Sequence, residues 1–422
     1  MQLFKKFIYN NGTLRHISHG GIPVLMEKIK KAPYRIFLIV LDFIALPISL
    51  PIVVLIRLIK PIYHIRLGYF YGGRIGHFAY DTAMTAMMLD KKVKGTHLFY
   101  FLPNIANKQW AKMVKRELNV YYWVRLLSFA NSIIPGGGSH SFIPGLNQEY
   151  VSRDLEGLIY HSDFEFKFTD IEIKFAKDWL QEKGWKDGDK IICIQVRDNQ
   201  YLPTKNWAYH DYRNSDINTY IPAMKLLAQK GYWVIRMGKT MKEPIKTQNS
   251  QIIDYAFDKQ KNDLIDVWLF ANCHLCISTG SGPDAISEVY RRPLLHINSL
   301  PLNHMVSSSN VTHTPKKLYW KKTGSLLTFR EYCENDFFYS QVYEAKGIEI
   351  VNLSPEEITT AVLEKIETME GYYVETEEDQ KLQRYFWDKA LKIKKFSDVN
   401  KFIHPQARVS LYFVRSHPNW LN

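Results

Sequence analysis

The sequence predicts a mixed α/β protein in which two parallel-sheet units follow an apolar, basic N-terminal segment. Short apolar runs alternate with amphipathic runs between residues 190 and 298, and less regularly between residues 62 and 126. One long apolar run, residues 36–59, has no counterpart in the rest of the chain. A chain of 422 residues is too long for one compact core, and its 46% hydrophobic residues exclude a disordered or collagen-like protein.

The N-terminal segment concentrates the positive charge of the chain. Residues 1–66 contain ten basic side chains and two acidic ones, a balance of +8 out of the total of +13. This basic block brackets the apolar run, so we expect an anionic membrane surface as the partner and no nucleic acid. The domain limits that follow are 1–61 for this segment, 62–168 and 169–350 for the two sheet units, and 351–422 for C-terminal helices and a tail that pack back on the domains.

The apolar run Ile36–Ile59 would form a helix about 36 Å long, enough to cross a bilayer. Pro47 and Pro51 interrupt it and Asp42 is charged, which disfavours a straight span. Because basic residues flank both ends, we predict a helix that breaks at 47–51 and returns to the same face. The catalytic cleft would then open at headgroup level. A single transmembrane helix and a buried core helix remain alternatives. Residues 34–59 also resemble the re-entrant membrane helix of bacterial phosphoglycosyl transferases.

The first sheet unit begins after this run. Period-two and helical patterns predict two βα units and a glycine-rich loop that can be mobile. The expected elements are a strand at 63–70, a tight loop at 72–76, a helix at 78–90, a strand at 96–102, a helix at 107–117, a strand at 119–126 and the loop at 135–140.

The second sheet unit has the clearest pattern in the chain. Thr169 and Glu172 form a capping box for a helix that ends at Gly184, which marks the domain boundary. Strands that are apolar on both faces then alternate with helices, as in a Rossmann-like domain with helices on both faces of the sheet. The expected strands are 191–196, 232–237, 252–257, 275–278 and 294–297, and the expected helices are 217–230, 264–272, 284–290, 354–369 and 379–395.

Chemistry is expected where these parallel strands end, because ligands of open α/β sheets bind beyond the carboxyl ends. One strand ends in a glycine-rich turn that enters a helix, which exposes backbone N–H groups at the positive end of the helix dipole. Cations follow two neighbouring strands. We therefore predict that a donor diphosphate is bound there, with Glu288 accepting ribose hydroxyls. The diphosphate residues would be Arg197, Arg236, Lys239, Ser278, Thr279, Gly280, Ser281 and Gly282. Alternatively, the glycines form only a turn and Arg197 a surface ion pair.

The first unit has a matching loop, Tyr71–His77, between its first strand and helix. It lacks the GxGxxG pattern, and no acidic residue ends the next strand, so a nicotinamide cofactor is not supported. His77 and Asp81 lie one helical turn apart, a spacing that suits a general base with an orienting carboxylate. The alternative is that His77 only caps its helix. Gly73, Arg74 and Gly76 belong to the same loop.

The strings GGRIGH, IQVRDNQY, WVIRMGK and CISTGSGPDAISEVYRRP resemble a family of bacterial glycosyltransferases associated with surface polysaccharide synthesis. The resemblance covers roughly residues 62–300 and is most specific from 190 to 298. It implies the GT-B fold, in which two Rossmann-like domains face a cleft, the second holding the nucleotide diphosphate and the first the acceptor. The resemblance therefore implies that the loop with Gly73, Arg74 and Gly76 is an acceptor loop. GGRIGH and QVRDN more weakly resemble elements of fucosyltransferase-like enzymes. Gln195 and His77 depart from those elements, so a GDP-fucose donor is not implied.

Metal motifs are weak in this chain. The CxxC spacing at 273–276 lies in an apolar run without a second ligand pair, and Asp187-Gly188-Asp189 reads as a turn. Four scattered cysteines fit a reducing compartment. We therefore expect no catalytic metal and no cofactor, and leaving-group stabilisation by Arg197, Arg236 and Lys239.

Together these features predict a metal-independent glycosyltransferase at the cytoplasmic face of the bacterial inner membrane, monotopic or single-pass. It would move a sugar from a nucleotide-diphosphate donor to a lipid-linked or lipopolysaccharide acceptor. The alternatives are a membrane-tethered sugar-binding scaffold on a degenerate transferase fold and a nucleotide-sugar epimerase.

Overall fold

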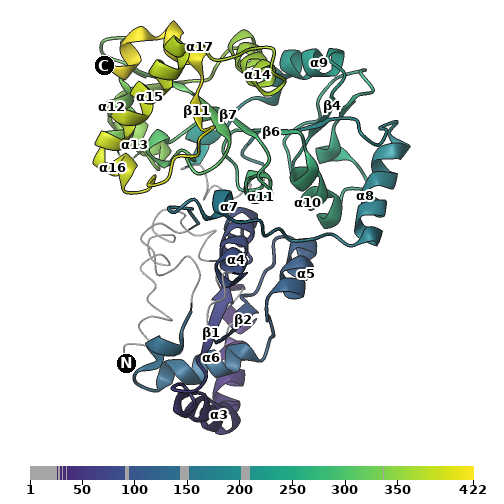
Figure 1. Ribbon diagram of the computed structural model, residues 1–422, viewed down its shortest axis with the longest axis vertical. Helices are drawn as coiled ribbons and strands as arrows, with labels where there is room; N and C mark the ends of the chain where they lie inside the picture. Colours follow the sequence, from purple (N-terminus) through teal and green to yellow (C-terminus); the bar gives the residue numbers. More distant parts are fainter. Residues whose placement is uncertain are drawn as a thin grey trace.

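A computed structural model describes residues 26, 29–30, 32–34, 36–90, 95–142, 152–200, 210–335 and 337–422. Its largest unit is a seven-stranded parallel sheet with the strand order β11-β8-β7-β6-β3-β4-β5 (Figure 1). The strands are β3 (Ile191–Gln195), β4 (Trp233–Arg236), β5 (Ile252–Ile253), β6 (Leu275–Ser278), β7 (Leu294–Ser299), β8 (Val311–Pro315) and β11 (Arg408–Val409). The C-terminal part of the chain therefore supplies an edge strand of the second domain.

The helices predicted from 264, 284 and 354 begin within one residue of those positions, whereas the helix predicted from 217 begins at Ile221, after a 3₁₀ turn at Ile217–Tyr220. The capping box predicted at Thr169 is present, with both of its hydrogen bonds, and the helix it starts ends at Glu182. The predicted strand at 252–257 is shorter, because a 3₁₀ turn at Tyr255–Phe257 follows β5. The helices are α7 (Leu158–His161), α8 (Asp170–Glu182), α9 (Ile221–Gln229), α10 (Asp263–Asn272), α11 (Asp284–Val289), α12 (Phe329–Glu334), α13 (Ser340–Ala345), α14 (Pro355–Met369), α15 (Glu377–Lys392), α16 (Lys394–Ser397) and α17 (Leu411–Ser416). An antiparallel pair, β9 (Lys317–Trp320) and β10 (Ile348–Val351), lies outside the main sheet.

The first domain is built on a smaller parallel sheet. Strands β1 (Ile65–Phe70) and β2 (Thr96–Phe101) pair in register, and single bridges from Val120 and Ser141 extend the sheet on its two sides. Helix α4 (Ile75–Asp90) packs on one face through the main core, and α6 (Val124–Ile133) packs on the other. Helix α5 (Lys108–Glu117) follows β2.

The expectation of a strand at 119–126 is wrong. Only Val120 pairs with the sheet, and the aromatic residues that follow form a turn before α6 begins. Val124, Leu127 and Ala130 recur at helical spacing, and all three are buried against the sheet. The helical periodicity therefore outweighs the β-propensity of Tyr121–Trp123.

The apolar N-terminal run forms two helices with a bend between them. Neither helix alone has the length and apolar composition to cross a bilayer, but Ala32–Ile44 and α3 (Leu46–Leu58) meet that requirement together, with a bend of 64°. The bend lies at Ala45, not at residues 47–51 as predicted, because Pro47 occupies the first turn of α3, where its missing N–H removes no helical bond. Pro51 lies inside α3.

The two domains meet at α4 and α11. Figure 1 shows the first domain, in purple and blue, below the second, with α4 reaching up to α11 at the junction and α3 at the opposite end. The main core is continuous across this junction, since residues of α4 and of the second sheet belong to one buried cluster.

Candidate functional site

The two glycine-rich loops predicted from the sequence touch each other, although 206 positions separate Gly76 from Gly282. A Cβ atom placed on Gly76 would lie 2.9 Å from both the Cα atom and the carbonyl oxygen of Gly282. Both loops follow the carboxyl end of a strand, β1 in one domain and β6 in the other. The structure therefore brings the predicted acceptor loop and the predicted donor loop to one place, where the domains join.

Backbone donors of the loop after β6 have partners within the protein. The N–H of Thr279 donates to the carbonyl of Gln195 at 3.2 Å, and the N–H of Ser281 donates to the Asp284 carboxylate at 2.8 Å. The buried hydroxyl of Ser278 accepts from the N–H of Gly280 at 3.1 Å and donates to Asp284 at 2.6 Å. An anion bound by these groups would therefore have to replace the hydrogen bonds they already make.

Cationic side chains surround this loop. A guanidinium nitrogen of Arg213 donates to the carbonyl oxygen of Gly280. The backbone N–H of Arg197 donates to Thr279 Oγ1 at 3.1 Å, which places Arg197 beside the same loop. Asn214 joins two of the cations: its side-chain oxygen accepts from Arg197 Nε at 3.1 Å and its carbonyl accepts from Lys316 Nζ at 2.5 Å. Arg197, Arg213 and Lys316 thus form a cationic cluster at the carboxyl ends of β3 and β6.

The electrostatics of this cluster favour an anion. The pKa of His210 is lowered to about 3, first by burial and then by the charges of Arg213, Arg197 and Arg74. Arg74 belongs to the first domain, so both domains contribute positive charge. Burial and the charge of Arg197 lower the pKa of Lys316 to about 7. In addition, the buried Nε of Arg213 finds no acceptor among the described residues. A phosphate group would offset the repulsion among these positive charges and could accept a hydrogen bond from this N–H of Arg213.

Three predicted donor residues lie elsewhere. Arg236 is fully buried and donates to the Glu243 carbonyl at 2.7 Å and to Asp254 at 3.3 Å, so it organises the loop between β4 and β5. Lys239 is exposed at the domain boundary, where its Nζ donates to the Ala106 carbonyl of the first domain at 2.9 Å.

Glu288, predicted to accept ribose hydroxyls, is the third of these residues. It is buried in α11, where its pKa is raised to about 7 by burial and by Asp284, while hydrogen bonds with Tyr80 and Ser309 lower it. Because Tyr80 lies on α4, Glu288 belongs to the packed contact between the domains and not to an open surface.

The predicted pair of His77 and Asp81 is joined through a third residue. Ser152 donates its hydroxyl hydrogen to Asp81 Oδ1 at 2.8 Å, and its oxygen lies 2.6 Å from His77 Nδ1. Burial, and then Arg74, lower the pKa of His77, whereas burial raises the pKa of Asp81 to about 7. No sequence pattern pointed to Ser152. It comes after the predicted loop at 135–140 in the chain, and its backbone φ is 60°.

This relay defines the tautomer of the histidine. When Asp81 is ionised, the single hydroxyl hydrogen of Ser152 is given to the carboxylate, so its oxygen must accept the Nδ1 hydrogen of His77. The lone pair of His77 then lies on Nε2. A neutral imidazole with a lowered pKa and a free lone pair can accept a proton from a hydroxyl group.

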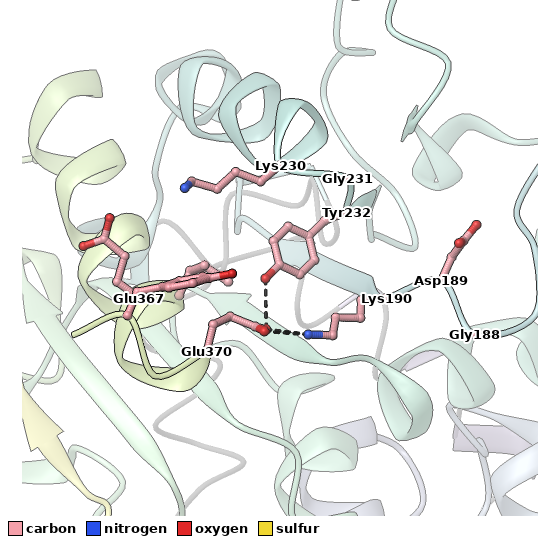
Figure 2. A pocket seen from close by; sticks show the side chains of 10 residues that line it. Gly188, Asp189, Lys190, Lys230, Gly231, Tyr232, Glu367 and Glu370 are labelled. Carbon is pink, nitrogen blue, oxygen red and sulfur yellow. Dashed lines mark hydrogen bonds and ion pairs between the residues drawn. The ribbon is translucent and has the colours of Figure 1, made fainter. Parts of the chain in front are cut away.

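No metal site accompanies these residues in the described part of the chain, where no three His, Cys, Asp or Glu side chains are placed to hold an ion. All four cysteines are buried. A cavity of about 590 Å³ lies at the amino ends of β3 and β4, away from the two glycine-rich loops. Figure 2 shows its centre, where Glu370 pairs with Lys190 at 2.6 Å and accepts from the Tyr232 hydroxyl at 3.0 Å.

No model of a known protein family matches the chain, and no curated protein matches it in sequence. Among solved structures, a glycosyl transferase family 9 protein from Veillonella parvula aligns with a TM-score of 0.42 at 10% identity, covering 74% of this chain and 99% of that one. ADP-heptose lps heptosyltransferase II from E. coli aligns at 0.32 with 13% identity, over 56% and 86%. UDP-GlcNAc 2-epimerase from Neisseria meningitidis, bound to UDP-GlcNAc, aligns at 0.32 with 10% identity, over 73% and 93%. These similarities are loose and include both transferases and an epimerase.

Proposed function

We propose that this chain is a glycosyltransferase of the two-domain GT-B type that takes its sugar from a nucleotide diphosphate. The observation that carries the proposal is the cationic cluster of Arg197, Arg213 and Lys316, which meets Arg74 and the His77 relay of the other domain. A diphosphate needs cations, and an acceptor hydroxyl needs a base. The cleft offers the first on one side and the second on the other.

In the proposed reaction, the acceptor oxygen attacks the anomeric carbon of the donor sugar while the bond from that carbon to the phosphate oxygen breaks. His77 Nε2 takes the hydroxyl proton, and Ser152 and Asp81 hold the ring in the tautomer that can do so. The nucleoside diphosphate leaves with the bonding electrons, and Arg197 and Arg213 stabilise its growing negative charge. The cations make a metal unnecessary for this step.

We further propose a lipid-linked or lipopolysaccharide acceptor at the cytoplasmic face of the bacterial inner membrane. The apolar helix pair at the N-terminus and its basic flanks support this placement.

The test is release of a nucleoside diphosphate that depends on an acceptor. Purified full-length chain would be incubated with UDP-, GDP- and ADP-sugars, with and without a bacterial glycolipid extract. Acceptor-dependent release supports a transferase. Conversion of the nucleotide sugar to its epimer without an acceptor and without net release of nucleoside diphosphate would identify an epimerase, and no nucleotide binding at all would leave only a scaffold.

A further inference from the structure

The apolar helices at the N-terminus pack against the first domain and form part of it. We call the helix Ala32–Ile44, α3 and α6 the helical slab. One stripe of α3, made of Ser49, Val53 and Ile56, is buried, and its apolar members pack with Val124 and Leu127 of α6 in one cluster. Helix α6 in turn packs on β1 and β2. The slab is therefore a layer of the folded domain.

Polar contacts fasten this layer at both ends. Near the bend, Arg125 of α6 pairs with the buried carboxylate of Asp42 at 2.5 Å and donates to the Leu38 carbonyl at 2.9 Å. At the end of α3, Arg57 donates to Asn131 Oδ1 at 2.8 Å and to the Ile134 carbonyl at 3.0 Å. The single acid in the apolar run thus has a structural partner, and both helices are held in register with α6.

The outer face of the slab is apolar and exposed. Ile44, Ile48 and Leu58 are each at least 70% exposed, and Tyr122 and Trp123 at the start of α6 are 57% and 48% exposed. A helix that is apolar on all sides is stable in water only when every side is covered, and here one side is not. Aromatic side chains beside such a face are typical of the boundary between lipid and water.

The charge of the slab selects the kind of partner. Residues 29–69 and 119–142 contain one acidic side chain, Asp42, and Arg125 neutralises it. Lys30 and Lys60 lie exposed at the two ends of the helix pair. An apolar face edged by cations alone fits anionic headgroups above hydrocarbon, whereas a second copy of the same face would bring like charges together.

We propose that the slab enters one leaflet of an anionic lipid bilayer and stays there, with Tyr122 and Trp123 at headgroup level. A spanning hairpin would have to carry the hydrogen-bonded Arg57 and Arg125, and the sheet behind them, into hydrocarbon. Insertion of the outer face alone leaves these contacts intact. The membrane is thus met by three helices of the first domain and not by a tether.

This placement also locates the cleft, a point that rests on the proposed function. In Figure 1, α3 and α6 lie at the end of the first domain away from α11, with β1, β2 and α4 between. We therefore replace the expectation of a cleft at headgroup level with one that stands off the surface. An acceptor anchored in the same leaflet has to extend along the first domain to reach it.

Site-specific labelling tests the slab directly, because the four native cysteines are buried. Ile48→Cys and Trp123→Cys would each carry an environment-sensitive fluorophore, with Tyr372→Cys, 81% exposed on the second domain, as the control. With vesicles of phosphatidylglycerol and phosphatidylcholine, the labels at 48 and 123 should shift to the blue and be quenched by nitroxide-labelled lipid, while the label at 372 stays unchanged. Phosphatidylcholine alone should bind more weakly.

The fraction of protein bound to vesicles gives a quantitative test. Trp123→Ala should lower vesicle partitioning by roughly tenfold, and Tyr372→Ala should not change it. Labels that remain in water with vesicles present would overturn the proposal, as would a dimer in solution that already shields position 48. Nucleotide binding measured on the same preparations separates this result from the proposed function, since a chain that binds vesicles but no nucleotide contradicts only the latter.

Discussion

The two glycine-rich loops that meet at the cleft look alike in sequence and differ in what they present. The loop after β6 is closed by Asp284, which accepts hydrogen bonds from Ser278 and Ser281. The loop after β1 leads instead into α4, whose first turns carry His77 and Asp81. Glycines mark where the backbone must turn and where two backbones approach closely, as Gly76 and Gly282 do. They do not say which groups face a ligand.

The two sides of the domain junction also differ in their titratable groups. Burial lowers the pKa of His77 and raises that of Asp81 to about 7, so above this pH a neutral imidazole stands beside an orienting carboxylate and the first domain is suited to moving a proton. Arg197 and Arg213 of the second domain retain fixed charges, which suit a diphosphate. If this division holds, changes on one side should alter turnover and changes on the other should alter donor binding.

The largest effect on turnover is expected from His77 in the first domain. His77→Ala should lower kcat by about 10²- to 10⁴-fold, the usual contribution of a general base, and leave the dissociation constant of the donor nearly unchanged. His161→Ala, exposed on α7, is the matched control. Steady-state kinetics with calorimetry of donor binding would measure both quantities. A folded His77→Ala protein with full turnover would return this histidine to the role of a helix cap.

Removing a cation from the second domain should have a smaller effect, and it should weaken donor binding instead of lowering kcat. Arg213→Ala should weaken donor binding by about 1.5 to 3 kcal/mol, the range for hydrogen bonds to charged groups, with little further loss in kcat at saturation. Arg330, an exposed arginine in an i,i+4 pair, offers a control of the same residue type. Equal affinity of the Arg213 and Arg330 variants, by titration calorimetry, would remove the cationic cluster from the donor site.

Much of this fold could be predicted from the sequence because it follows local patterns. The limits predicted for β6 are those observed, and the capping box at Thr169 is present. Helix α6 was missed because three aromatic residues before it favour a strand, and only its burial on the sheet shows that the helical spacing wins. The spacing of apolar residues shows which face of a helix or strand is buried, but it does not show which element packs against that face.

The site was less accessible to sequence reasoning. Arg197 was found because it follows a predicted strand, and it lies in the cationic cluster. Arg213, Lys316 and Ser152 were not found, because they lie on connecting segments far apart in the chain and follow no period. Tertiary packing brings Arg213 and Lys316 to the loop regions beside Arg197 and brings Ser152 to His77 and Asp81, and a single sequence does not encode these contacts as a spacing.

The free energy of unfolding should depend on pH through Glu288, which lies where α11 packs against α4. The folded-state pKa of Glu288 is raised to about 7, so its charged form is disfavoured, and the stability it allows at low pH is lost as the pH rises through 7. Glu288→Gln should therefore be more stable than the unmodified chain at pH 8 by about 1 to 3 kcal/mol and equal to it near pH 4. Denaturant unfolding at both pH values measures this. Exposed Glu349→Gln should show no such pH dependence, and a parallel response in the two variants would contradict the assignment.

The smallest effect concerns the proton balance of donor binding. Burial and Arg197 lower the pKa of Lys316 to about 7, so at pH 7.5 much of this amine is neutral before a ligand arrives. A bound diphosphate favours the ammonium form, and binding should then take up a fraction of a proton, about one half, from the buffer. Calorimetry at pH 7.5 in two buffers of different ionisation enthalpy measures that number. The uptake should vanish below pH 6, where Lys316 is already charged, and in Lys316→Met, but persist in the exposed control Lys321→Met. Uptake that survives in Lys316→Met would mean that another group titrates on binding, and the division between a proton side and a cation side would then have to include that group.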